Sequence, residues 1–176
     1  GNTCGSFLCY EGAKDVGVEF NSLSKTYGLA GARVGFCIGN KEVVKNLSNL
    51  KSNMDYGMFL PVQKAAIAAI TGDQSCVETV RKAYENRRNI LCDGLNEIGW
   101  KMNRCPATMF VWAKIPSKYT SSEKFCIELL DKTGVLVTPG SAFGPSGECH
   151  VRMALVQDED EMKKAIESIK NSDILK

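Results

Sequence analysis

The chain has 176 residues, of which 44% are apolar, and a formal net charge of +2. This length and apolar content allow one ordinary domain or two small ones with a real hydrophobic core. No apolar run approaches the ~20 residues that span a bilayer, and the first residues lack the basic-then-apolar order of a signal peptide, so we expect a globular cytoplasmic protein without membrane contact.

The charge pattern and the cysteines argue against two further classes. The densest basic stretch, residues 81–88, is interrupted by Glu85 at helical spacing, which indicates a solvated helix face rather than a nucleic-acid surface. The eight cysteines are scattered without a C-x-x-C pair, and His150 is the only histidine. We therefore expect reduced thiols and no metal site.

The first half of the chain predicts two strands and three helices. Residues 1–15 show no sustained period, and strands are expected near 16–21 and 33–38. Helical spacing of apolar residues follows in 41–53, in 62–70 after Pro61, and in a long segment of about 75–98 that Gly99 ends.

After Gly99 the pattern becomes strand, helix, strand, strand, helix. Strands are expected in 108–115, 135–137 and 149–156. Thr120 and Glu123 fit a capping box for a helix that Gly134 closes, and Asp158 with Glu161 three residues later starts the last helix. The sequence thus predicts an α/β protein with an α/β unit in its C-terminal half.

The first half supplies too few strands to form a covered sheet. A parallel sheet with helices on both faces needs more strands than residues 1–55 provide. We therefore interpret the chain as the C-terminal part of a larger α/β protein.

Lys25 is the residue whose surroundings suggest chemistry. Ser22 and Ser24 precede it closely, a glycine turn follows, and Arg33 comes eight residues later. Hydroxyls, backbone donors and a planar guanidinium are suited to a phosphate dianion. A phosphate cradle beside an amine suits pyridoxal phosphate, whose aldehyde condenses with a lysine.

The pattern S-x-S-K, seven residues and an arginine resembles the cofactor-lysine signature of the class I/II aminotransferases, which are fold-type-I pyridoxal-phosphate enzymes. The resemblance extends over nearly the whole chain. It includes the stretch G-A-K-D at 12–15, the long helix, the turn P-G-S-A-F-G at 139–144 and the strand V-R-M-A at 151–154. The sequence around Lys25 is most similar to that of the branch with LL-diaminopimelate, alanine and aspartate aminotransferases.

The resemblance implies a role for each matching residue. Lys25 is the Schiff-base lysine that also shuttles the substrate proton, and Ser22 and Arg33 hold the cofactor phosphate, with Ser24 as a further cofactor-binding position. Arg152 grips the substrate α-carboxylate. Tyr56, in the loop 52–59, approaches the cofactor of the partner subunit, since the resemblance implies a homodimer. His150 shares the sheet face of Arg152 and is expected to be a structural neighbour.

The upstream cofactor motifs of the family are absent from the chain: a glycine-rich phosphate turn, a stacking aromatic residue, an asparagine and an aspartate for the pyridine nitrogen. The resemblance therefore implies three parts: residues 1–72 as the remnant of the large cofactor domain, 73–99 as the connecting helix and 100–176 as the small α/β domain. We expect the isolated fragment to be inactive.

Three functions remain open. The main hypothesis is transamination between an amino-acid donor and a 2-oxo acid. The alternatives are a lyase of the aminocyclopropane-carboxylate synthase type, which shares the lysine and both arginines, and a non-catalytic binding or assembly module. The sequence does not identify the substrate side chain.

Overall fold

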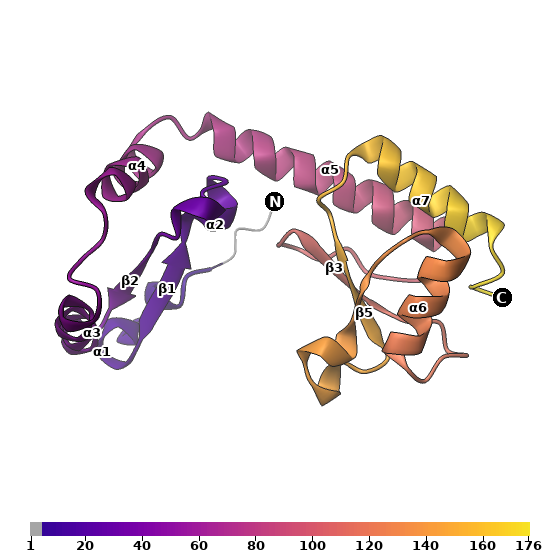
Figure 1. Cartoon of the computed structure of the whole chain (residues 1–176), viewed down its shortest axis with the longest axis horizontal. Helices are drawn as coiled ribbons and strands as arrows, with labels where there is room; N and C mark the ends of the chain where they lie inside the picture. The colour runs from indigo at the N-terminus through magenta and orange to yellow at the C-terminus, as the bar shows by residue number, and fades with distance from the viewer. Residues whose placement is uncertain (1–4) are drawn as a thin grey trace. The chain divides into compact units, whose positions relative to one another are not determined.

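The computed structural model describes residues 5–176, which form two compact units divided between Val80 and Arg81. Figure 1 shows a small ribbon with helices in the first unit and a sheet with helices in the second. Helix α5 (Ser75–Glu97) crosses the division, so its residues belong in part to each unit. The expected domain limits at residues 72 and 99 remain a prediction.

The first unit is built on an antiparallel ribbon of β1 (Val18–Ser22) and β2 (Gly35–Gly39), in which Ser22 lies opposite Gly35. The Glu19 carboxylate accepts hydrogen bonds from the Phe7 amide and the Ser6 hydroxyl, at 2.6 and 2.7 Å, which ties the N-terminal segment to β1. The other elements are η1 (Phe7–Cys9), α1 (Ala13–Val16), α2 (Leu23–Thr26), η2 (Ala30–Ala32), α3 (Lys41–Met54) and α4 (Leu60–Thr71).

The structure shifts the beginning of the first strand. The expected strand at 16–21 starts only at Val18, because the Gly17 amide bonds the Ala13 carbonyl and closes one helical turn that includes Val16. Lys25 lies within α2, one turn of helix that follows β1 directly.

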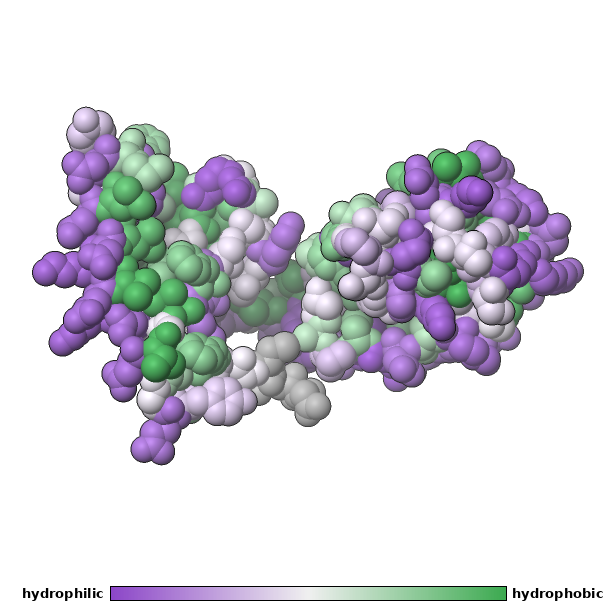
Figure 2. Space-filling view, turned by 90° about the horizontal axis from the view of Figure 1, so that it is seen from below, coloured by the Kyte–Doolittle hydropathy of each residue, from purple (hydrophilic) through white to green (hydrophobic). Residues whose placement is uncertain are grey.

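The first unit buries little apolar surface. Its buried apolar residues are Ala13, Leu23 and Val34, and α3 and α4 contain no buried residue. Figure 2 shows apolar side chains at the surface of this unit. The helical periods predicted for 41–53 and 62–70 are therefore present as helices, but every residue of α3 and α4 stays at least partly exposed.

The second unit has a three-stranded antiparallel sheet in the order β3-β5-β4. Its strands are β3 (Phe110–Lys114), β4 (Thr138–Pro139) and β5 (His150–Ala154), and its further elements are α6 (Ser122–Thr133), η3 (Gly140–Phe143), η4 (Pro145–Gly147) and α7 (Glu159–Asn171). One sheet face is buried in a continuous core with residues of α5, α6 and α7, and it carries Val111, Ala113, Val151 and Met153. The alternation in β3 and β5 therefore leaves Phe110, Trp112, His150 and Arg152 on the opposite face.

Two of the expected helix boundaries are confirmed and one is wrong. Asp158 caps α7 by accepting from the Glu161 amide, and Gly134 ends α6 at φ 72°. The cap of α6, however, is Ser121, whose hydroxyl accepts from the Lys124 amide, and not Thr120.

The strand expected at 135–137 also moves, to Thr138–Pro139. The Val135 amide bonds the Thr133 hydroxyl at 3.2 Å, so the turn after α6 uses a backbone donor that a strand ladder would need. Val137 is buried in the core instead.

The seven cysteines that the structure describes are free thiols, and Cys4 lies outside the described residues. Within residues 5–176, no helix combines the length and the apolar composition that a membrane crossing demands.

Candidate functional site

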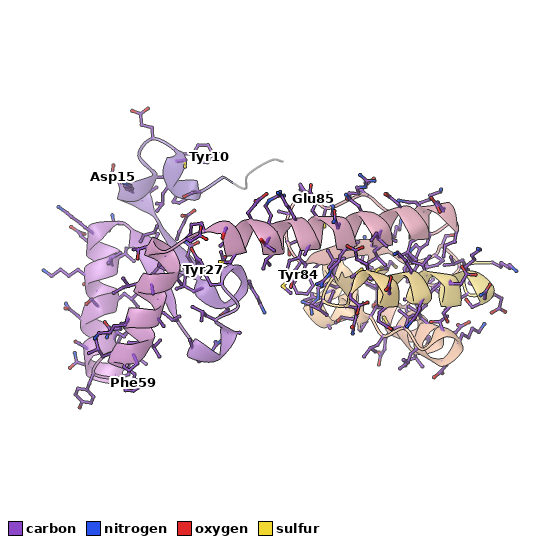
Figure 3. All side chains as sticks on the ribbon, turned by 90° about the horizontal axis from the view of Figure 1, so that it is seen from above. Tyr10, Asp15, Tyr27, Phe59, Tyr84 and Glu85 are labelled. Atoms are coloured by element: carbon purple, nitrogen blue, oxygen red, sulfur yellow. The ribbon has the colours of Figure 1, made fainter. Side chains whose placement is uncertain are left out.

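Lys25 is the third residue of α2, and Ser22 fixes where that helix begins. The Ser22 hydroxyl accepts from the Ser24 amide at 3.1 Å, so Ser22 is both the last residue of β1 and the helix cap. Tyr27 ends the helix, and its hydroxyl donates to Oε1 of Gln74 at 2.9 Å (Figure 3). The Lys25 side chain is exposed, and among the described residues its amine has no hydrogen bond or ion pair.

Arg33 reaches the same end of the ribbon through the hairpin. The Leu23 amide bonds the Val34 carbonyl at 3.3 Å, one step beyond the Ser22–Gly35 pair, and α2 contacts η2, which Arg33 ends. The Arg33 backbone is left-handed, with φ 51° and ψ 51°, and Nη1 donates to the Ala30 carbonyl at 2.9 Å. The other guanidinium donors have no partner among the described residues.

Ser22 and Ser24 together have one hydroxyl proton to offer. Their hydroxyls share a hydrogen bond of 2.9 Å, so one of the two O–H groups is used and the other is free. A free hydroxyl, the remaining guanidinium donors and an unpaired amine are the donor set that a phosphate-bearing aldehyde needs. The residues at this end of the ribbon therefore fit pyridoxal phosphate.

Tyr56 does not join this group. It follows the end of α3, with a left-handed backbone at φ 57° and a side chain that is 92% exposed. In the described part of the first unit, no hydrogen bond or ring contact connects Tyr56 with Lys25 or Arg33. Its expected approach to a partner subunit stays a prediction.

Arg152 lies on the open sheet face of the second unit, next to two aromatic rings. Its guanidinium carbon is 4.3 Å from the centre of the Phe110 ring and 4.5 Å from that of Phe143. The Nε atom is buried without a hydrogen-bond partner, and no ion pair of Arg152 occurs in residues 5–176. A buried, unpaired guanidinium donor is costly unless an acceptor arrives, which suits an anionic ligand.

Further rings extend this cluster along the sheet. Trp112, the cross-strand neighbour of Arg152, meets the Phe143 ring edge-on at 5.7 Å and stacks on the His150 ring at 5.6 Å. His150 Nδ1 lies 3.1 Å from the Glu148 carbonyl oxygen. The predicted common face of His150 and Arg152 is confirmed by this arrangement.

The segment that carries Phe143 is fastened to the start of α6. The buried Ser122 hydroxyl lies 3.1 Å from the Ser141 hydroxyl and accepts from the Ser141 amide at 3.3 Å. The Glu148 carboxylate accepts from the Ser122 amide at 2.6 Å and from the Cys149 amide at 3.2 Å. The bonds from Ser122, with that from Cys149, hold the pKa of Glu148 below its ordinary value.

Sequence reasoning missed Phe143 and Phe110 as contacts of Arg152. Phe143 belongs to the same P-G-S-A-F-G turn that identified Arg152, and Phe110 alternates with buried residues in β3. The signal was therefore present, but nothing in the sequence shows that both rings face one guanidinium.

The sequence matches the family described as "Aminotransferase class I and II" over residues 8–169. Among curated proteins, it is 47% identical over 167 residues to the glutamate-pyruvate aminotransferase AlaC of Escherichia coli, covering 94% of this chain and 40% of that protein. It is 44% identical over 169 residues to the LL-diaminopimelate aminotransferase of Halothermothrix orenii, covering 96% and 43%.

Solved structures give the same result for the fold. The substrate-bound BacF structure from Bacillus subtilis superimposes with a TM-score of 0.88 at 36% identity, over 94% of this chain and 42% of that one. An aminotransferase structure from Staphylococcus aureus matches with the same score at 32% identity, over 94% and 44%. The chain thus spans less than half the length of the relatives that it matches.

Proposed function

The chain belongs to the class I and II aminotransferase family, and we propose that it supplies the lysine and two arginines for pyridoxal-phosphate-dependent transfer of an amino group from an amino acid to a 2-oxo acid. The observation that carries this proposal is the unpaired Lys25 amine on a helical turn capped by Ser22 and in contact with the turn that Arg33 ends. When bound, the cofactor supplies an aldehyde for the amino group and an electron sink for the bond broken at Cα.

Lys25 would hold the cofactor covalently through Nζ and, once displaced by the substrate amine, move a proton at the substrate Cα. Both tasks need an amine with no competing acceptor, and the exposed Lys25 side chain meets that need. The short α2 helix, held by Ser22 and Tyr27 at its two ends, limits where the side chain can begin.

The phosphate would be held by Arg33 and by the free hydroxyl of the Ser22–Ser24 pair. A guanidinium presents parallel donors to phosphate oxygens, whereas the hydroxyl adds a neutral donor beside them. On the second unit, Arg152 would bind the α-carboxylate that every amino-acid donor and 2-oxo acid shares. The aromatic rings beside it accept no conventional hydrogen bond from it, so its N–H groups stay available.

The 176-residue chain alone would not turn over substrates. It contains no aspartate motif for the pyridine nitrogen and no glycine-rich phosphate turn of the family type. We propose that the complete protein is a cytoplasmic homodimer in which Tyr56 approaches the partner's cofactor. The names of the two relatives make glutamate, pyruvate and LL-diaminopimelate the first substrates to test.

The decisive test is the chemical identification of the cofactor lysine in the complete protein. Borohydride reduction followed by peptide mass spectrometry should find the cofactor mass on Lys25, because reduction makes the lysine–cofactor bond permanent. Lys25→Ala should abolish both the labelled peptide and amino-group transfer. Lys14→Ala, which removes another exposed lysine of the same unit, should leave both intact; a labelled peptide in the Lys25→Ala protein would disprove the assignment.

The same preparation separates the lyase alternative. With a labelled amino donor and 2-oxoglutarate, a transaminase delivers the amino nitrogen to the oxo acid, whereas a lyase eliminates a group from the donor without forming a second amino acid. Nitrogen transfer would therefore reject the lyase, and binding without any turnover in the complete protein would favour the non-catalytic module.

A further inference from the structure

The guanidinium of Arg152 is held by ring faces rather than by hydrogen bonds. Its guanidinium carbon is 4.3 Å from the centre of the Phe110 ring and 4.5 Å from that of the Phe143 ring. In residues 5–176 none of its nitrogens has a hydrogen-bond partner. Carboxylates are the usual partners that fix a buried arginine, but they occupy its N–H donors. Ring faces attract the cation while leaving the donors in its plane free.

Phe143 is itself held in place from two sides. The Trp112 ring meets it edge-on at 5.7 Å with an interplanar angle of 73°, a favourable geometry for aromatic pairs. On its backbone side, η3 is fastened through Ser141 to the buried Ser122 of α6. Half of the Phe143 side chain nevertheless remains exposed, so its packing with Arg152 is not required to fill the hydrophobic core.

We propose that Phe110 and Phe143 are positioning residues that clamp the Arg152 guanidinium in one plane, with its donors directed at the substrate carboxylate, and that Trp112 fixes Phe143. This proposal rests on the proposed function of Arg152. The clamp would increase carboxylate affinity because the arginine loses little rotational freedom when the carboxylate binds. It gives the rings a role beyond filling space.

The first test is spectroscopic and needs neither cofactor nor activity. In the 176-residue chain, the side-chain Nε–H proton of Arg152 should resonate far upfield, because the guanidinium carbon lies within 4.5 Å of two ring centres, and Arg152→Lys identifies the signal. Phe143→Leu should move this resonance toward its ordinary position, and Phe143→Tyr should preserve it. Tyr84→Leu, which removes the Tyr84 ring 5.6 Å from Arg87, is the matched control and should leave the Arg152 signal unchanged.

The second test measures kcat/KM for an amino-acid donor in the complete cofactor-loaded enzyme. Phe143→Leu should lower it by on the order of 3- to 30-fold, the equivalent of one cation–π contact. Phe143→Tyr and Tyr84→Leu should keep it near the wild-type value. In the Arg152→Lys background, Phe143→Leu should lower kcat/KM no further. A residue that acts through the Arg152 guanidinium has no effect once that guanidinium is absent.

The outcomes separate the two proposals. If Arg152→Lys leaves kcat/KM unchanged, the carboxylate role of Arg152 fails and the positioning proposal fails with it. If Arg152→Lys is impaired but Phe143→Leu behaves like Tyr84→Leu, or if the two losses simply multiply, the clamp is rejected while the function of Arg152 stands. An Nε–H resonance at its ordinary position in the wild-type chain would also reject the clamp.

Discussion

Arg33 combines an unfavourable backbone conformation with a useful side chain. A left-handed conformation costs an L-residue about 1–2 kcal/mol relative to a right-handed one, and glycine would adopt it without this cost. Such outliers concentrate at functional sites, where the rest of the structure maintains them. The bond from Nη1 to the Ala30 carbonyl anchors one corner of the guanidinium and leaves the rest for a ligand.

Replacing Arg33 by alanine should therefore weaken cofactor retention more than it affects folding. The lost charge-assisted contact corresponds to about 1.5–3 kcal/mol, so the cofactor dissociation constant of the complete protein should rise roughly 10- to 100-fold. Arg104→Ala removes another arginine, one paired with Asp93 in the second unit, and should leave the constant unchanged. Titration of the apoprotein with cofactor measures both; equal constants for wild type and Arg33→Ala would remove Arg33 from the phosphate site.

At the scale of single elements, the start of α6 is defined by contacts from distant parts of the second unit. Thr120 and Ser121 have equivalent capping chemistry, and the sequence pattern favours Thr120. The Glu148 carboxylate, 26 residues further along, bonds the Ser122 amide and so takes part in fixing the first turn one residue later than predicted. The Glu148 carboxylate thus helps to hold α6, η4 and β5 in one arrangement.

Glu148 makes the free energy of unfolding of the second unit depend on pH in the acidic range. Its pKa is below 4.5 in the folded unit because the Ser122 amide and hydroxyl, and then the Cys149 amide, favour the carboxylate. The unfolded chain thus binds the proton more readily than the folded one below about pH 4.5. The contribution of Glu148 is complete above that pH and disappears as the pH falls through the lower, folded-state pKa.

Glu148→Gln should accordingly destabilise the second unit at neutral pH and much less in acid. Urea unfolding, followed by the fluorescence of Trp100 and Trp112, which both belong to this unit, gives the free energy of unfolding at each pH. The difference between wild type and variant should shrink as the pH falls below about 4.5 and through the lower, folded-state pKa. Glu97→Gln, at an exposed position on α5, should show no such trend; a constant difference for Glu148→Gln would contradict the role of its charge.

Local chemistry explains which parts of the site the sequence could predict. The hydroxyls and the lysine lie within four residues, and the hairpin that returns Arg33 to them follows from two strands and a glycine turn. The clamp on Arg152 instead joins residues 110, 143 and 152 through strand register and through the Ser122–Ser141 contact. Such long-range packing leaves no period in the sequence, so a pattern could propose Arg152 but not what holds it.

At the scale of the whole molecule, apolar burial is distributed unequally. The second unit contains a continuous core with several fully buried side chains, among them Leu95, Phe125 and Leu129. Among the described residues of the first unit, only three apolar residues are buried. Large apolar side chains of the first unit are exposed, for example Phe20 and Phe59, each at 73%; Figure 3 shows Phe59 projecting outward. Helices of this length gain most of their stability from packing, so the two units should differ in local stability.

Helices α4 and α6 provide a matched comparison, since each has 12 residues. In the 176-residue chain, amide hydrogen exchange in α4 should be at least ~100-fold faster than in α6, because α4 buries no residue and can open without exposing a core. The α6 amides should exchange only when the second unit unfolds, since Phe125 and Leu129 are fully buried. Mass spectrometry of peptic peptides resolves the two helices in one experiment. Equal protection in α4 and α6 would show that α4 is stabilised by more than the burial of its side chains.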